Sequence, residues 1–238
     1  EEVTAILGPC VAEAFRDRLF VHHPDDPAGL VTVGVTRRGH EVRINRRAIS
    51  AARRILMGGV VYHYHAGFGG GRKSLVPGLA GRDTIAFNHS LTLDPDRDRL
   101  HSGVGPGRLD GNPVAEEMLE AARLCRPDAI VNTVLDPSGR LVGVFAGDLD
   151  LAHRAACARA AEALSAPMAE PADLVVASAG SARNWIQSHK ALYNAHRAVR
   201  RGGQVVLLAP CPEGIGEDSF RRWVRRPRLK DIYAGLRA

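Results

Sequence analysis

The chain has 238 residues, 45% of them hydrophobic, which is enough for the core of one or two globular domains. Its formal net charge is +6, but the arginine pairs are spread along the whole chain without interleaved aromatic residues, so nucleic-acid binding is not expected. No apolar run approaches the ~20 residues of a membrane-spanning helix, and no signal peptide is visible. The four cysteines are scattered, as is typical of small buried residues in a reducing cytoplasm.

Both ends of the sequence fall inside helix-like patterns. The chain opens on Glu1 without an initiator methionine and ends on Ala238. We therefore expect the sequence to be part of a longer chain, truncated at both ends.

The first part of the chain predicts a helix, a hairpin and a second, shorter helix. Residues 2–20 form a helical pattern that ends in a polar turn. Residues 30–35 and 41–45 alternate around an Arg-Arg-Gly turn, as the strands of a β-hairpin do. A short helix is expected over residues 48–54.

An apolar run at residues 55–61 predicts a buried strand, and it leads into the most unusual stretch of the chain. The following residues, 62–90, hold a glycine-rich loop, one lysine and three histidines: His63, His65 and His89. A helix is expected from about residue 83, with His89 in its second turn. So many ligand-type side chains beside so flexible a backbone indicate a functional site.

The remainder alternates helices with strands, which favours an α/β fold. After a polar loop at 94–108, helices are expected over 113–125, 150–165 and 184–200 and at the end, and strands over 128–135, 141–145, 174–178 and 204–209. The low-complexity segment SAPMAEPAD is the expected domain boundary. We therefore predict two α/β domains with a cleft between them: residues 1–165, whose start is missing, and residues 166–238, which form part of a second domain.

Only three of the 32 cationic residues are lysines, namely Lys73, Lys190 and Lys230. Lysine can lose its proton when buried and act as a nucleophile, whereas arginine in practice cannot. In a chain where arginine is the usual cation, a lysine is expected where an amine is required.

The segment GFGGGRKS (67–74) is close to a phosphate-binding P-loop, but Arg72 stands where the last glycine should be. Pro77 and Gly78 also argue against the sustained helix that a P-loop lysine opens. A nucleotide triphosphatase, a glycine-rich loop that binds some other phosphate and a tight turn without function all stay open.

His63 and His65 share a face of an extended chain, and His89 could complete a three-histidine zinc site. In the second half, Gln187 and Lys190 lie at helical spacing and point the same way. The latter signal is weak by itself, because a solvated helix face has the same pattern.

Together these residues resemble the lactate racemase family, enzymes that use a nickel-pincer nucleotide. The resemblance covers nearly the whole chain and the spacing of its central motif is specific. The matching features are H-x-x-A-G-F-G-G-G-R-K (63–73) with the following Pro-Gly, Asn88-His89, GRLDGNP (107–113), VFAGD (144–148) before Ala152-His153, Gln187-x-x-Lys190 and CPEGIG (211–216).

The resemblance implies that the lysine matching Lys73 is bonded through a thioamide to the nickel-pincer nucleotide (pyridinium-3,5-bisthiocarboxylic acid mononucleotide nickel). It implies that Gly69, Gly70, Gly71 and Arg72 help to bind this cofactor. The metal is held by a ring carbon, two sulfurs and the histidine matching His89, and neutral imidazole suits square-planar nickel.

The resemblance also implies roles in catalysis. The histidine matching His63 is one of two acid/base residues on opposite sides of the substrate, and the residues matching Gln187 and Lys190 reach in from the second domain. The Cα–H of a 2-hydroxy acid is a poor acid, so hydrogen leaves as hydride to the cofactor ring while the base takes the hydroxyl proton. Such a base typically contributes ~10²–10⁴-fold.

The sequence departs from the family pattern in two places. The partner histidine and the first phosphate-binding residues lie upstream of Glu1. A Gly-Gly-x-Pro-x-Asp stretch and the tyrosine before the glutamine are replaced by AGSARNWI, which places Ile186 beside Gln187. We therefore expect a 2-hydroxy acid other than lactate.

The expected protein is a cytoplasmic racemase or epimerase of a 2-hydroxy acid, loaded by cofactor-biosynthesis proteins and without nucleic-acid or membrane partners. Its oligomeric state is not predicted. The alternatives are a catalytically incomplete homologue that binds the cofactor or another ligand, and a zinc-dependent hydrolase that uses His63, His65 and His89.

Overall fold

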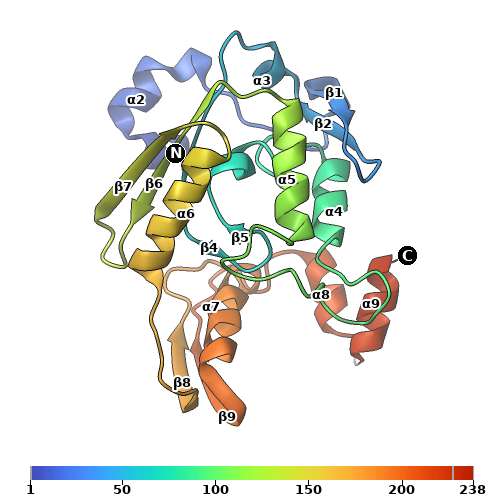
Figure 1. Ribbon diagram of the computed structural model, residues 1–238, viewed down its shortest axis with the longest axis vertical. Helices are drawn as coiled ribbons and strands as arrows, with labels where there is room; N and C mark the ends of the chain where they lie inside the picture. Colours follow the sequence, from blue (N-terminus) through green and yellow to red (C-terminus); the bar gives the residue numbers. More distant parts are fainter. Residues whose placement is uncertain (1, 227, 238) are drawn as a thin grey trace.

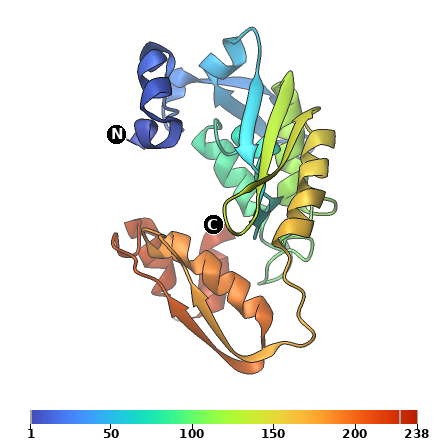
Figure 2. The same cartoon turned by 90° about the vertical axis from the view of Figure 1, so that its left-hand side faces the viewer.

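The computed structural model of the chain describes residues 2–226 and 228–237, so Glu1 and Ala238 lie outside the described residues. Figure 1 shows an upper body that contains most of the helices and strands, and a lower part that contains α7, β8 and β9, with α8 and α9 to the right of them. A quarter turn of the molecule shows that one extended segment joins the two parts (Figure 2).

The amino-terminal segment contains short helices and not the single helix predicted over residues 2–20. Helix α1 (Glu2–Leu7) and helix α2 (Pro9–Ala14) are separated by Gly8, whose φ is 78°. A 3₁₀ turn at Arg16–Arg18 follows. The single-helix prediction is wrong because Gly8 adopts a left-handed conformation and the proline after it favours a new first helical turn.

The predicted hairpin is confirmed with the predicted bounds. Strands β1 (Leu30–Val35) and β2 (Glu41–Asn45) pair antiparallel. The Asn45 side chain accepts hydrogen bonds from the backbone N–H groups of Arg47 and Ala48 in α3 (Arg46–Ser50), and this cap starts the helix earlier than the predicted residue 48.

A three-stranded sheet forms the centre of the upper body, in the order β3-β6-β7. Strand β3 (Ile55–Gly59) runs parallel to β6 (Ala129–Leu135), which pairs antiparallel with β7 (Leu141–Gly147). Strand β3 was predicted to be buried, and this holds for one of its faces only: Leu56 lies in the core, whereas Met57 is 72% exposed. Helix α6 (Leu151–Leu164) packs against β6 and β7.

The central stretch lies between this sheet and two helices. It contains the short strands β4 (Tyr62–His63) and β5 (Gly67–Phe68) and the 3₁₀ helix η3 (Gly71–Ser74). Helices α4 (Arg82–Ser90) and α5 (Pro113–Leu124) follow, and the buried Asn112 caps α5 as its Asn-Pro sequence predicts.

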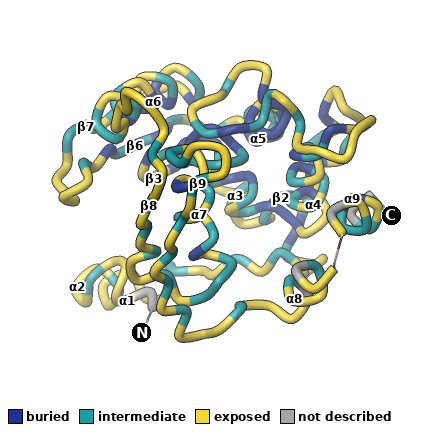
Figure 3. The backbone as a smooth tube through the Cα atoms, turned by 90° about the horizontal axis from the view of Figure 1, so that it is seen from below, coloured by how far each residue is buried: buried dark blue, intermediate teal, exposed yellow. Residues whose placement is uncertain are grey.

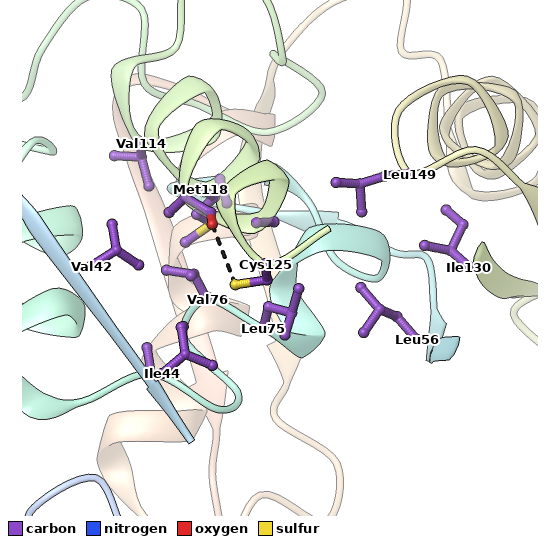
Figure 4. Close-up of a cluster of buried hydrophobic side chains, with 14 of the residues drawn as sticks. Val42, Ile44, Leu56, Leu75, Val76, Val114, Met118, Cys125, Ile130 and Leu149 are labelled. Atoms are coloured by element: carbon purple, nitrogen blue, oxygen red, sulfur yellow. Dashed lines mark hydrogen bonds between the residues drawn. The ribbon is translucent and has the colours of Figure 1, made fainter. Parts of the chain in front are cut away.

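The hydrophobic core joins the hairpin, the central stretch and α5. Figure 4 shows Ile44, Leu75, Val76 and Met118 pointing toward one another from these elements. Because Leu75 and Val76 come directly after Lys73-Ser74, the packing of this core fixes one end of the segment that carries Lys73.

The lower part of the molecule is a βαβ unit. Strands β8 (Ala172–Ser178) and β9 (Val199–Leu208) are parallel and are joined by helix α7 (Trp185–Ala198), which Asn184 caps as its N-cap residue. Helices α8 (Asp218–Val224) and α9 (Leu229–Arg237) complete the chain. Seen from below, the strands β8 and β9 are mostly exposed (Figure 3).

The fold is therefore mixed α/β, as predicted. The division into domains at residue 165, with a cleft between them, stays a prediction. None of the helices in the described ranges is long and apolar enough to cross a membrane.

Candidate functional site

His63 is the last residue of strand β4, and its ring nitrogen Nδ1 accepts hydrogen bonds from the backbone of the turn that follows. The backbone N–H groups of His65 and Ala66 donate to this nitrogen at 3.2 and 3.0 Å. An N–H group cannot accept a hydrogen bond, so Nδ1 carries the lone pair and neutral His63 has its proton on Nε2. Burial, followed by the charge of Lys73, lowers the pKa of His63 to about 3.

This tautomer bears on the role expected for His63. A base that takes a proton at Nε2 needs its own proton on Nδ1, as in other catalytic histidines. In the present arrangement His63 is a hydrogen-bond donor through Nε2. To act as a base at that atom, it must give up both bonds from His65 and Ala66.

Lys73 lies half-buried in η3, directly after the glycine-rich loop. Burial is the main reason that its pKa falls to about 8, and the nearby charges of Lys190 and Arg72 lower it further. Among the described residues, no carboxylate forms an ion pair with Lys73 or Lys190. A substantial fraction of Lys73 is therefore a neutral amine at mildly alkaline pH, as a nucleophilic lysine requires.

His89 lies in the last turn of α4. Its Nδ1 is 2.8 Å from the carbonyl oxygen of Ile85, one turn earlier in the same helix. Because a carbonyl can only accept, Nδ1 carries the proton and Nε2 has a free lone pair. A hydrogen bond of this kind is the usual way in which a protein orients a metal-binding histidine.

Gln187 and Lys190 share a face of α7, as their spacing predicts, and Nζ of Lys190 donates to Oε1 of Gln187 at 2.5 Å. The charge of Lys190 lowers the pKa values of both His63 and Lys73, which places it beside the central loop. Direct contact between the two segments is made by Tyr64. Its ring lies 5.5 Å from the ring of His189 and 5.8 Å from that of Tyr193, both on α7.

The structure thus brings His63, Lys73, His89 and Lys190 into one electrostatic cluster. The pKa of His89 is lowered chiefly by burial, and the charge of Lys73 lowers it further. The pKa of His65 falls to about 4 because of burial and then the influence of His89 and His189. Partly buried bases with lowered pKa values, here His63, Lys73 and His89, are typical of a functional site, and with the exposed cation of Lys190 beside them they favour a negatively charged ligand.

The glycines of the loop and Arg72 have different surroundings from the cluster. Gly70 and Gly71 have positive φ values of 71° and 52°, which glycine adopts without strain. Arg72 is only 2% exposed, and Nη1 of its guanidinium donates to Nδ1 of His153 at 3.0 Å. Its predicted role in binding a cofactor stays a prediction, and in this conformation its guanidinium bonds to helix α6.

Sequence reasoning missed two residues that hold the loop, Asn132 and His153. The Oδ1 atom of Asn132, on β6, accepts a hydrogen bond from the backbone N–H of Gly71 at 2.8 Å. The sequence assigns His153 no role beyond its place in a segment that resembles the family. Two features of the sequence could have pointed to these residues. Asn132 is a polar residue on a predicted buried strand, and His153 is a histidine in an alanine-rich helix.

The three histidines proposed for a zinc site do not form one here. The rings of His63 and His65 lie 6.3 Å apart and edge to face. Within the described residues, no group of three or more His, Cys, Asp or Glu side chains is placed to hold a metal ion. The arrangement therefore gives no support to a zinc site made by these side chains alone.

Comparison with known proteins relates the chain to the lactate racemases. Residues 1–100 match the family model described as the lactate racemase N-terminal domain. The lactate racemase of Thermoanaerobacterium thermosaccharolyticum is 30% identical over 231 residues, which cover 96% of this chain and 52% of that protein. The lactate racemase of Lactiplantibacillus plantarum is 31% identical over 209 residues, which cover 86% and 48%.

Solved structures show the same relationship. The lactate racemase apoprotein from T. thermosaccharolyticum matches with a TM-score of 0.80 at 30% identity, over 91% of this chain and 51% of that one. A protein from Thermotoga maritima shares the fold, with a TM-score of 0.64 at 16% identity over 86% and 54% of the two chains. The chain spans about half the length of the curated relatives it matches, and the family model and both relatives place its similarity with the lactate racemases.

Proposed function

We propose that this chain belongs to a racemase or epimerase that inverts a 2-hydroxy acid. The observation that carries the proposal is the cluster in which His63, Lys73, His89 and Lys190 influence one another electrostatically, while no carboxylate of the described residues forms an ion pair with either lysine. Such a cluster suits an anionic substrate and an anionic cofactor. The two curated relatives, both named lactate racemases, support the same reaction type.

The residues fit a covalently bound nickel-pincer nucleotide. Lys73 offers a half-buried amine whose pKa is about 8, and His89 offers a free Nε2 lone pair held in place by Ile85. The cation of Lys190, which has no ion pair among the residues that the structure describes, suits the phosphate of a nucleotide or the carboxylate of a substrate. When bound, the cofactor supplies an acceptor for the hydrogen on the Cα atom of the substrate.

The remaining steps fall to side chains of this chain. Lys190 binds an anionic oxygen, and Gln187, which is hydrogen-bonded to Lys190, orients its ammonium group. His63 binds the substrate hydroxyl group and takes its proton at Nε2 once Nδ1 holds the other proton. The ring of Tyr64 stacks on that of His63 at 4.8 Å, which restricts the orientations that His63 can adopt.

We propose that the substrate is not lactate. The residue before Gln187 is Ile186, whose Cδ1 atom would lie 2.9 Å from a Cβ atom on Gly216. Here an aliphatic side chain packs against the segment that resembles CPEGIG of the family, in the position where the family pattern has a tyrosine. This side chain has no hydroxyl group, so it cannot form a hydrogen bond that a tyrosine could offer there, and this position is less polar.

The direct test uses the full-length protein, produced together with the proteins that synthesise the cofactor. We expect an intact mass increased by one nucleotide-sized adduct, mapped to Lys73, and interconversion of the enantiomers of at least one compound in a panel of 2-hydroxy acids. An adduct without interconversion of any compound would support the alternative of a binding protein. An unmodified mass in the presence of available cofactor would contradict the proposal.

The His65→Ala variant separates this proposal from the zinc hydrolase. The Nδ1 atom of His65 is buried without a hydrogen-bond partner, and the zinc hypothesis makes this side chain a metal ligand. We expect the variant to retain the nickel content and the Lys73 adduct of the unchanged protein, because His89 is the only protein ligand that we propose. Metal analysis of the two proteins, prepared in parallel, checks this. Loss of the bound metal from a folded His65→Ala protein would favour the zinc site.

A further inference from the structure

The side chain of His153 lies against the glycine-rich loop from helix α6. Its ring is 0% exposed, Nε2 is 2.8 Å from the carbonyl oxygen of Gly69, and Nδ1 is 3.0 Å from Nη1 of Arg72. The carbonyl can only accept and the guanidinium can only donate, so Nε2 carries the proton and Nδ1 is the acceptor. Both ring nitrogens therefore bond to the loop, and the partners fix one neutral tautomer.

The backbone of the loop is fitted closely to this ring and to Asn132. A Cβ atom on Gly71 would lie 2.6 Å from Cδ2 of His153, and one on Gly70 would lie 2.7 Å from Oδ1 of Asn132. Contacts this short do not occur for real Cβ atoms unless a neighbour moves. The loop therefore has its present path only because glycines face these two buried side chains.

The bond to Arg72 has a second consequence. This guanidinium is nearly fully buried, and within the described residues no carboxylate forms an ion pair with it. Burial, the main cause, lowers its pKa to about 10, and its Nε atom has no partner. A buried charge that loses a hydrogen-bond partner is costly, so without the Nδ1 acceptor of His153 the arginine would favour a conformation closer to solvent.

Arg72 is followed directly by Lys73, whose backbone N–H donates to the carbonyl oxygen of Gly70 at 3.0 Å. The backbone of Lys73 is thus fixed to the loop twice, by its peptide link to Arg72 and by its hydrogen bond to Gly70. A loop that releases Arg72 would also move Lys73 out of the partly buried site beside Lys190.

We infer that His153 is a positioning residue, which holds residues 69–72 in the one conformation that buries the amine of Lys73 beside His63 and Lys190. It acts through Gly69 and Arg72 and touches neither substrate nor cofactor in this assignment. The use of Lys73 as an attachment point rests on the proposed function, whereas the effect of His153 on the loop does not.

The experiment compares the unloaded full-length protein with its His153→Phe variant, which keeps a buried ring but removes both hydrogen bonds. Val134→Ala is the matched control, since it removes buried bulk from the same layer between β6 and α6. Two properties are measured: hydrogen exchange of the amides of residues 69–75, and the pH dependence of Lys73 modification by an amine-directed reagent, followed by peptide mass.

We expect Lys73 in the unchanged protein and in the control to titrate near pH 8. In His153→Phe the midpoint should move toward the ordinary lysine value of 10.5, and the loop amides should lose protection. A general loss of stability would affect the control equally. A folded His153→Phe protein with an unchanged midpoint and unchanged protection would overturn the inference.

A second pair of variants keeps the inference testable if His153→Phe does not fold. Gly71→Ala should disturb the loop in the unchanged background, because the new methyl group meets the His153 ring. In a His153→Ala background the same methyl group has room and only the backbone strain of the positive φ at residue 71 remains, so Gly71→Ala should cause a smaller loss of protection than in the unchanged background. Additive effects of the two substitutions would show that the contact does not hold the loop. Neither readout involves cofactor or substrate, so failure of the racemase proposal would be seen separately.

Discussion

Replacing Lys73 with arginine is expected to remove the nucleotide adduct completely and to reduce racemisation to the background of the assay. Arginine keeps the positive charge and much of the length of lysine, but it stays protonated and cannot form the covalent bond. The structure makes Lys73 the suitable amine, since its pKa is about 8 through burial and two nearby cations. Intact mass, followed by peptide mapping of the same sample, measures the adduct directly.

Lys230→Arg is the matched control for this experiment. Lys230 is exposed and belongs to helix α9, which is apart from the central loop. We expect this variant to keep both the adduct and the activity. Retention of the adduct in Lys73→Arg, or its loss in a folded Lys230→Arg protein, would mean that the cofactor is attached elsewhere or held without a covalent bond.

Replacing His63 with glutamine is expected to reduce turnover by ~10²–10⁴-fold, the usual contribution of a general acid or base. Glutamine can still donate a hydrogen bond to the substrate, but it cannot take up a proton. The Lys73 adduct should be unaffected, because His63 has no proposed part in attachment. Steady-state kinetics and intact mass of the same preparation separate the two effects, and the exposed His196 on α7 offers a control as His196→Gln.

The glutamine variant also decides between two roles for His63. In the structure its neutral ring donates through Nε2, because His65 and Ala66 bond to Nδ1. If His63→Gln keeps most of the activity, then His63 acts only as a hydrogen-bond donor through Nε2. Another group must then take the proton of the substrate hydroxyl group. A large loss of kcat with little change in KM means that the turn over residues 63–66 rearranges during the reaction.

Local signals predicted those parts of the fold in which neighbouring residues decide the conformation. The hairpin over residues 30–45 and the start of α5 at Asn112-Pro113 were predicted because alternation, turn residues and an N-cap all act within a few positions. The helix over residues 2–20 was predicted wrongly, although Gly8 and Pro9 were visible, because the helical pattern around them was given more weight.

The candidate site divides in the same way. The short spacing between His63 and Lys73 could be recognised in the sequence, and the match with the family extended to Lys190. The roles of Asn132 and His153 could not be predicted, because each contacts a loop that lies more than 60 positions earlier in the chain. A buried polar residue shows its partner only when the sheet and the helix have been assembled.

The contact between Tyr64 and helix α7 has a consequence for proton uptake. While α7 lies against the central loop, the charge of Lys190 contributes to the low pKa values of His63 and Lys73. Burial is the main cause of both low values, but any movement that withdraws α7 removes the contribution of Lys190, so near pH 8 separation of the two segments lets Lys73 take up protons and their closure releases them. Higher pH therefore favours the closed arrangement, and a bound anion favours it further by compensating the charge of Lys190. A substrate carboxylate would in this way help to close the site around itself.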